Sequence, residues 1–256
     1  MLPKRLRYII SSTILTFGFV WIQFLDSQFK FLGIAILVIL SIIGSYWSFY
    51  EGLGKNATLF SIILPMLFTL GVGIFWFLLP SNIFTRIPTV ILYFIGVYIL
   101  LSTMNIYTVS SRKTIALLRA ARGVGFVLTL LTAFFIFDAI LSVRQNPFVS
   151  VPLVFVSSVL LFLQGFWSID LEKEFNKKII TLSLISSYIV SQLAIMIFFW
   201  PVSVVVGSLF LTASIYLLLG IGQAKLEDRL FPSIVREYLT VGMIVLIGMF
   251  FATRWG

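Results

Sequence analysis

Cysteine and histidine are both absent from this chain of 256 residues. Without cysteine the chain has no disulfides, thiolate nucleophiles, palmitoylation sites or iron–sulfur ligands. Without histidine it lacks the commonest general base and the usual protein ligand of zinc and haem. Neither a glycine-rich phosphate loop nor a pair of carboxylates within an apolar segment takes their place. The sequence therefore predicts a protein that is not an enzyme and has no catalytic residues, metal site or cofactor.

Charge is scarce as well, since only 11% of the residues are charged. The 46 residues from Ile179 to Ala224 contain no charged side chain, and Trp200-Pro201 lies almost at the middle of this run. A straight helix of that length would extend about 69 Å, more than twice the thickness of about 30 Å of a bilayer's hydrocarbon core. The run therefore predicts two membrane spans joined by a tight turn.

Apolar residues make up 60% of the chain, and its mean hydropathy is +1.12. So little polar surface cannot cover a water-soluble globule of this size. The apolar runs are continuous over about 16 to 25 residues, whereas the strands of a membrane barrel would alternate over about ten. We therefore expect an all-α polytopic integral membrane helix bundle, with residues 1–256 forming a single transmembrane domain.

Charges and turn residues divide the chain into nine candidate spans. They are Tyr8–Leu25, Phe31–Tyr50, Thr58–Leu79, Pro88–Thr108, Val124–Leu141, Val151–Ser168, Ile179–Phe199, Val202–Gly222 and Tyr238–Thr253. The first follows a basic segment, as in a signal peptide, but Phe19-Val20-Trp21-Ile22 offers no small residues for cleavage. We therefore expect the first span to be retained.

The distribution of basic residues predicts the orientation of these spans. With a cytoplasmic N-terminus, 14 of the 18 lysines and arginines fall in cytoplasmic segments, as the positive-inside rule requires. The same rule accounts for the net charge of +9, so no nucleic-acid partner is expected. The last segment has 16 residues and would span only about 24 Å. Eight spans followed by a surface-lying C-terminal helix are the alternative.

Several landmarks recur at an interval of about 120 residues. Trp47-Ser48 resembles Trp167-Ser168, and Arg119 with Val124-Gly125 has the same internal spacing as Arg236 with Val241-Gly242. A parallel duplication of a four-helix unit, with internal units 1–122 and 123–256, would explain these similarities. The alternative is chance likeness, because apolar sequences resemble one another by composition alone.

Asp138 is the only acidic residue inside an otherwise apolar span. A carboxylate is costly in a membrane, so such a residue is a candidate for proton uptake or cation binding. Asp138 also lies near the outer end of its span, where Arg144 is close enough along the chain to pair with it. The favoured interpretation is therefore a structural ion pair or an interfacial position.

Polar uncharged side chains form the rest of the candidate intramembrane site. Gln164 and Gln192 are amides that need hydrogen-bond partners in lipid, and Gln192 follows a row of serines at helical spacing, namely Ser183, Ser187 and Ser191. Such a row either lines a polar pathway or permits close packing of helices, and packing is the commoner use.

A basic amphipathic segment precedes the fifth span. Its cations, Arg112, Lys113, Arg119 and Arg122, are candidates for contact with anionic lipid headgroups on the cytoplasmic face. Membrane lipids are thus the expected partners, and the sequence identifies no protein partner.

Two functions fit these features. The leading hypothesis is a permease-like protein that transports or handles a small solute, and the alternative is a non-catalytic membrane subunit or scaffold that binds lipids or a partner protein. A polar cavity lined by the candidate residues would favour the first, and a solid apolar core the second. The amounts of Phe, Ile and Lys indicate an AT-rich bacterial genome, which predicts the bacterial cytoplasmic membrane as the location.

Overall fold

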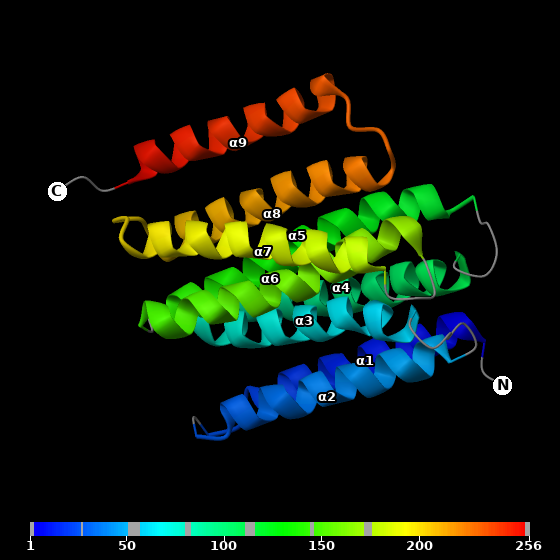
Figure 1. Cartoon of the computed structure of the whole chain (residues 1–256). Coiled ribbons are helices and arrows are strands. Elements are labelled where there is room, and N and C mark those ends of the chain that lie inside the picture. Colours follow the sequence, from blue (N-terminus) through cyan, green and yellow to red (C-terminus); the bar gives the residue numbers. More distant parts are fainter. Residues whose placement is uncertain are drawn as a thin grey trace. The chain divides into compact units, whose positions relative to one another are not determined.

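The chain is helical throughout the part that its computed structural model describes, which comprises residues 3–26, 28–50, 57–79, 83–110, 116–143, 146–171 and 176–253. These residues form nine α-helices and no strand (Figure 1). Eight of the nine are long and apolar enough to cross a membrane. The predicted class, an all-α polytopic membrane helix bundle, is confirmed.

The helices follow one another with short connections. In chain order they are α1 (Lys4–Ile22), α2 (Lys30–Phe49), α3 (Ala57–Leu78), α4 (Ile83–Ser110), α5 (Leu118–Ser142), α6 (Pro147–Asp170), α7 (Lys177–Phe198), α8 (Val204–Leu226) and α9 (Pro232–Ala252). Several are longer than the apolar runs that predicted them, notably α4 and α5. Hydropathy marks only the part of a helix that lies in hydrocarbon, whereas backbone hydrogen bonding continues the helix into the interface.

The last helix is longer than the sequence predicted for the C-terminal segment. Pro232 occupies the first turn of α9, where its missing N–H costs nothing, and the helix thereby reaches 21 residues. This length and its composition suffice for a span. The helix outside the group of eight is α1, whose 19 residues include Lys4, Arg5 and Arg7. The predicted C-terminal span therefore begins too late in the chain, and the helix that contains it has the length and composition of a span.

The chain divides into two compact units, residues 1–128 and 129–256. The helix α5 begins in the first unit and ends in the second. The boundary that the sequence predicted, after residue 122, falls in the same helix. This division reflects spatial packing and not sequence likeness, so the duplication of a four-helix unit stays a prediction.

Aromatic rings fill the core of the first unit, where α1, α3 and α4 meet. The Phe19 ring stacks on Tyr93 with 4.5 Å between centroids and meets Trp76 edge-on at 5.1 Å. On another side, Phe68 is parallel to Tyr93 at 6.1 Å. All four side chains are buried. Tyr93 of α4 thus contacts rings from both α1 and α3.

A chain of hydroxyl groups joins three helices of the same unit. The Tyr93 hydroxyl donates to Thr69 Oγ1 at 3.3 Å, Thr69 donates to Ser41 Oγ at 3.2 Å, and Ser41 donates to the carbonyl of Pro65 at 3.2 Å. Pro65 lies inside α3, and its carbonyl is engaged by a neighbouring helix. Polar groups within a membrane need hydrogen-bond partners inside the protein, because lipid supplies none.

Helices α6 and α7 pack side by side in the second unit (Figure 1). The buried residues of α7 include four serines, Ser183, Ser186, Ser187 and Ser191, together with Ala194. Gly165 of α6 serves the contact with α8, since a Cβ atom there would lie 2.5 Å from Leu219 Cδ1. Lipid supplies no hydrophobic force between helices, so close packing of this kind holds the unit together.

Candidate functional site

Asp138 is buried in the second half of α5 and contacts α8. Its Oδ1 atom accepts a hydrogen bond of 3.2 Å from Ser208, whose hydroxyl also lies 2.9 Å from the carbonyl of Val205. Only 4% of Asp138 is exposed. Arg144, the partner that the sequence suggested, lies outside the described residues. The contact that the structure provides for this carboxyl group is therefore a hydroxyl on a neighbouring helix.

Gln164 belongs to a separate polar contact. Its Oε1 atom accepts a hydrogen bond of 3.3 Å from Thr129, and both side chains are almost fully buried. Thr129 and Asp138 are nine residues apart on α5, which is about 13.5 Å along the helix axis. The structure therefore does not bring Asp138 and Gln164 into one cluster.

The serine row of α7 is buried, but the amide beside it is not. Ser187 donates to the carbonyl of Ser183 at 2.7 Å, and Ser191 donates to the carbonyl of Tyr188 at 2.7 Å. The Ser183 hydroxyl is buried and has no hydrogen-bond partner among the described residues. Gln192 is exposed on another face of the helix. The three serines of the row are thus buried between helices, and Gln192 is not part of that buried face.

The predicted headgroup contacts are only partly within the described residues. Arg119 is exposed and Arg122 half-buried, both in the first turns of α5. Arg112 and Lys113 lie outside the described residues. A cation-rich helix start at the predicted cytoplasmic boundary is suited to phosphate headgroups. Within the described part of the chain, no group of three or more acidic residues could hold a metal ion.

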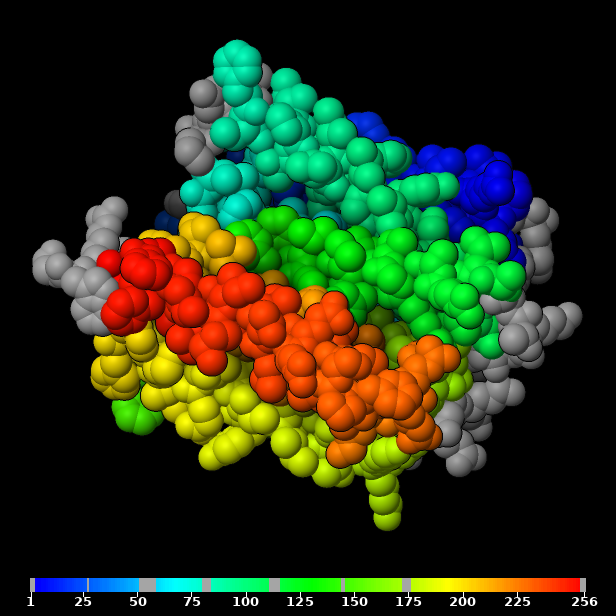
Figure 2. Space-filling view, turned by 90° about the horizontal axis from the view of Figure 1, so that it is seen from above, coloured from blue at the N-terminus to red at the C-terminus, as the bar shows by residue number. Residues whose placement is uncertain are grey.

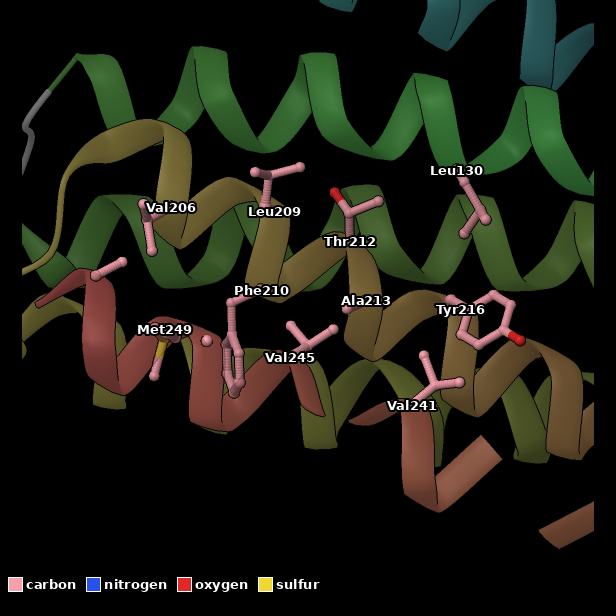
Figure 3. A pocket seen from close by; sticks show the side chains of 12 residues that line it. Leu130, Val206, Leu209, Phe210, Thr212, Ala213, Tyr216, Val241, Val245 and Met249 are labelled. Carbon is pink, nitrogen blue, oxygen red and sulfur yellow. The ribbon is translucent and has the colours of Figure 1, made fainter. Parts of the chain in front are cut away.

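The sequence did not predict a large apolar groove in the second unit. It has a volume of about 570 Å³ and lies between α8 and α9, with Leu130 of α5 adding a third wall (Figure 3). The α8 wall comprises Val206, Leu209, Phe210, Thr212, Ala213 and Tyr216. Its only polar side-chain groups are the Thr212 hydroxyl and the Tyr216 phenol. The Thr212 hydroxyl is bonded to the carbonyl of Ser208 in its own helix. Thr212 therefore contributes no hydrogen-bond donor to the groove, whose lining is mainly hydrocarbon.

The opposite wall comes from α9 and is made mainly of small or β-branched side chains. Its residues recur at helical spacing and are Val241, Val245, Gly248, Met249 and Ala252. A Cβ atom at Gly248 would have nothing within 4 Å. The helical spacing of these residues can be read from the sequence, but the sequence does not show that they border a groove against α8.

A contact between α9 and its neighbours lies near each end of the groove. At one end Trp200 Nε1 donates a hydrogen bond of 2.7 Å to Thr253 Oγ1. At the other end the Tyr216 and Tyr238 rings lie 5.2 Å apart, and Tyr238 rests directly against Gly220. Only Met249 of α9 is buried, and Figure 2 shows the helix, in orange and red, uncovered along its length.

One protein family matches the chain over residues 9–252, which include helical residues from α1 to the end of α9. The chain belongs to the DUF5656 family. The description of this family is "Protein of unknown function (DUF5656)". No match was found among curated proteins or among solved structures. Membership of this family therefore leaves the function to be argued from the site.

Replacing Ser208 by alanine should lower the free energy of unfolding by about 1 kcal/mol, within the range measured for hydrogen bonds between membrane helices. The substitution removes the hydroxyl of α8 that donates a hydrogen bond to Asp138. Unfolding of the purified protein in mild detergent by increasing dodecyl sulfate would measure the change.

Ser214→Ala is the matched control for this prediction. Ser214 is buried on the same helix, but its hydroxyl donates to the carbonyl of Phe210 in that helix. We expect a smaller loss than for Ser208→Ala. Equal losses, or no coupling between Ser208→Ala and Asp138→Ala in a double-mutant cycle, would contradict a stabilising contact between α5 and α8.

Proposed function

We propose that this chain is a non-catalytic membrane subunit or scaffold, located in the bacterial cytoplasmic membrane, that binds lipids through its helices and its basic cytoplasmic ends. The observation that carries the proposal is the contrast between its polar groups and its cavities. Asp138 and Gln164 are each engaged by a hydroxyl inside the packed second unit. The large groove between α8 and α9 includes neither of them in its lining, which is mainly hydrocarbon.

A smaller cavity in the first unit has the same character. It has a volume of about 190 Å³ and lies between α1 and α2, with Ile14, Leu15, Leu40 and Ile43 among its lining residues. Its one hydroxyl-bearing residue, Ser11, is hydrogen-bonded to Ser48 at 3.1 Å. Apolar cavities that open toward lipid suit hydrocarbon chains, whereas a solute pathway needs groups that replace water.

Anionic lipid headgroups are the second proposed ligand. Arg119 and Arg122 lie at the start of α5, on the side that the charge distribution predicts to be cytoplasmic. Each basic residue near an anionic membrane surface contributes about 1 kcal/mol of attraction. Arg112 and Lys113 precede them in the sequence and would add to the same effect.

Permease-like transport is the competing function, and it makes different demands on the same residues. It needs a water-accessible path that connects polar side chains across the membrane. The Asp138 and Gln164 contacts are about 13.5 Å apart along α5, and Gln192 is exposed away from the buried serine face. These positions favour the binding protein over the transporter.

Thiol labelling would distinguish the two functions, because every introduced cysteine would be the only thiol in the chain. Gln164→Cys, Ser183→Cys and Ser187→Cys proteins in liposomes would be treated with a charged, membrane-impermeant methanethiosulfonate reagent. We expect no labelling from either side, since these side chains are buried between helices. Mass spectrometry of the intact protein would count the labelled molecules.

Two positions calibrate the labelling. Ser233→Cys lies at the exposed start of α9 and should react fully from the predicted cytoplasmic side. Met243→Cys lies on the exposed side of the same helix within the span and should not react in lipid. Labelling of the three buried positions at the level of Ser233→Cys would exclude the proposed function and favour the permease.

A further inference from the structure

The groove between α8 and α9 occupies only one half of the membrane span. Its α8 wall runs from Val206 to Tyr216, while the helix itself runs from Val204 to Leu226. Ten residues of helix extend about 15 Å, which is half of a hydrocarbon core of about 30 Å. The groove therefore has the depth of a single leaflet.

The position of the groove along the helices identifies that leaflet. Val206 lies in the first turn of α8, and Ala252 precedes Thr253, which is hydrogen-bonded to Trp200 in the turn that joins α7 to α8. Tyr216 and Val241 lie near the middle of their helices. With the N-terminus on the cytoplasmic side, as the basic residues predict, the turn between α7 and α8 is on the outer side. The groove thus extends from the outer interface to the middle of the bilayer.

Contacts near the two ends of the groove restrict what can occupy it. The Trp200–Thr253 hydrogen bond holds α9 against the turn before α8, next to Ala252, and the Tyr216–Tyr238 contact holds α8 against α9, three residues before Val241. A helix is about 10 Å wide with its side chains and crosses both leaflets, so it does not fit lengthwise between two such contacts. A hydrocarbon chain is narrower, ends at the bilayer midplane and enters sideways from the surrounding lipid.

We infer that this groove is a binding site for the acyl chain of an outer-leaflet phospholipid. The volume of about 570 Å³ is within the usual range of ligand cavities, about 300 to 1,000 Å³. The carbonyl end of the chain lies between Val206 and Ala252, and its methyl end reaches Tyr216 and Val241. The inference rests on the proposed function and deepens it, since it assigns the site and the part of the lipid that is bound.

Gly248 makes the inference testable, because it leaves open space in the α9 wall. A leucine at this position would fill part of the groove without meeting a neighbouring atom at its Cβ. Ala213 lies in the opposite wall, so Ala213→Leu fills the same space from α8. Two variants from different helices protect the test against a folding defect in either one.

The experiment uses the full chain in nanodiscs of phosphatidylethanolamine and phosphatidylglycerol that contain a phosphatidylcholine with a diazirine in one palmitoyl chain. After irradiation, mass spectrometry of peptides would locate the adducts. We expect a diazirine near the carbonyl to label the region around Val206 and Ala252, and one near the methyl end to label the region around Tyr216 and Val241. Gly248→Leu and Ala213→Leu should each reduce groove labelling about tenfold, equivalent to about 1.4 kcal/mol.

Met243→Phe is the control, because Met243 lies on the exposed side of α9, outside the groove lining, and the substitution adds volume there. It should leave the labelling of the groove unchanged. Groove labelling that does not exceed that of Met243 in the unsubstituted protein, or that survives both leucine substitutions, would overturn the inference.

A second copy of the chain is the rival occupant, and the same protein tests it. A single cysteine at Gly248 would form disulfide-linked dimers under mild oxidation if α9 of another copy filled the groove. Such dimers, together with absent lipid adducts, would also overturn the inference. Either result would leave the thiol labelling of Gln164→Cys and Ser187→Cys unaffected, so failure of the lipid site is distinguishable from failure of the proposed function.

Discussion

Substitution of Gly165 by leucine is expected to lower the free energy of unfolding by about 3 kcal/mol, at the upper end of the range for overpacked cores. Even a Cβ atom at this position would lie 2.5 Å from Leu219 Cδ1, and Leu219 is fully buried. The larger side chain would separate α6 from α8 and strain the hydrogen bond of 3.0 Å from Gln223 to the Gly165 carbonyl. Unfolding in detergent with increasing dodecyl sulfate would measure the loss.

The cause can be isolated by two further variants. Leu219→Ala combined with Gly165→Leu removes the side chain that the new leucine meets, so part of the lost stability should return. Gly123→Leu is the matched control, because a Cβ atom at Gly123 would have nothing within 4 Å. A large loss for Gly123→Leu, or none for Gly165→Leu, would show that close contact between α6 and α8 does not limit stability.

Replacing Tyr93 by alanine should destabilise the first unit by about 3 kcal/mol, the lower end of the range for buried aromatic residues. The lower end is expected because lipid is itself apolar, so the loss comes from packing and not from transfer out of water. Tyr93 is 1% exposed, stacks on Phe19 and Phe68, and donates its hydroxyl to Thr69. The same detergent unfolding experiment measures the effect.

Two comparisons separate the ring from the hydroxyl of Tyr93. Tyr93→Phe keeps the ring and removes only one hydrogen bond, for which about 1 kcal/mol is expected. Tyr46→Ala removes a tyrosine that is 49% exposed and should change stability little. If Tyr46→Ala were as damaging as Tyr93→Ala, the stacked rings between α1, α3 and α4 would not be the source of the stability.

The role of a polar side chain within the membrane depends on which residues pack against it. From the sequence, Asp138, Gln164, Gln192 and the serines of α7 were one candidate group. In the structure the first two have separate hydroxyl partners, the serines face a packed interface, and Gln192 is exposed. A polar group in lipid needs a partner, and a nearby hydroxyl satisfies that need without any pathway for a solute.

The existence and order of the spans were predictable, because transfer into hydrocarbon depends on composition over about 20 residues. The uncharged run from Ile179 to Ala224 is indeed two helices, α7 and α8, with Trp200-Pro201 between them. The ends were less predictable. Helix α9 begins at Pro232, six residues before the predicted start, since backbone hydrogen bonding and not hydropathy sets the start of a helix.

The direction that a side chain faces was predictable only where one face differs chemically from the other. In α7 the serines repeat every fourth residue and turned out to be buried. In α9 both faces are apolar, so its sequence did not show which face meets α8 and which borders the groove. Lipid is as apolar as the side chains of α9, so hydrophobicity does not determine which face of the helix packs against its neighbour. Steric fit determines it.

By itself, therefore, the sequence determined that this protein is helical, multi-pass and without histidine or cysteine chemistry. Those properties follow from composition and from the cost of placing an unsatisfied backbone in hydrocarbon. The tertiary structure alone decided that Ser208 meets Asp138, that Thr129 meets Gln164, and that a groove of about 570 Å³ lies between α8 and α9. These features depend on contacts between residues far apart in the chain, and such contacts are set by how the helices pack together, which neither composition nor local periodicity reveals.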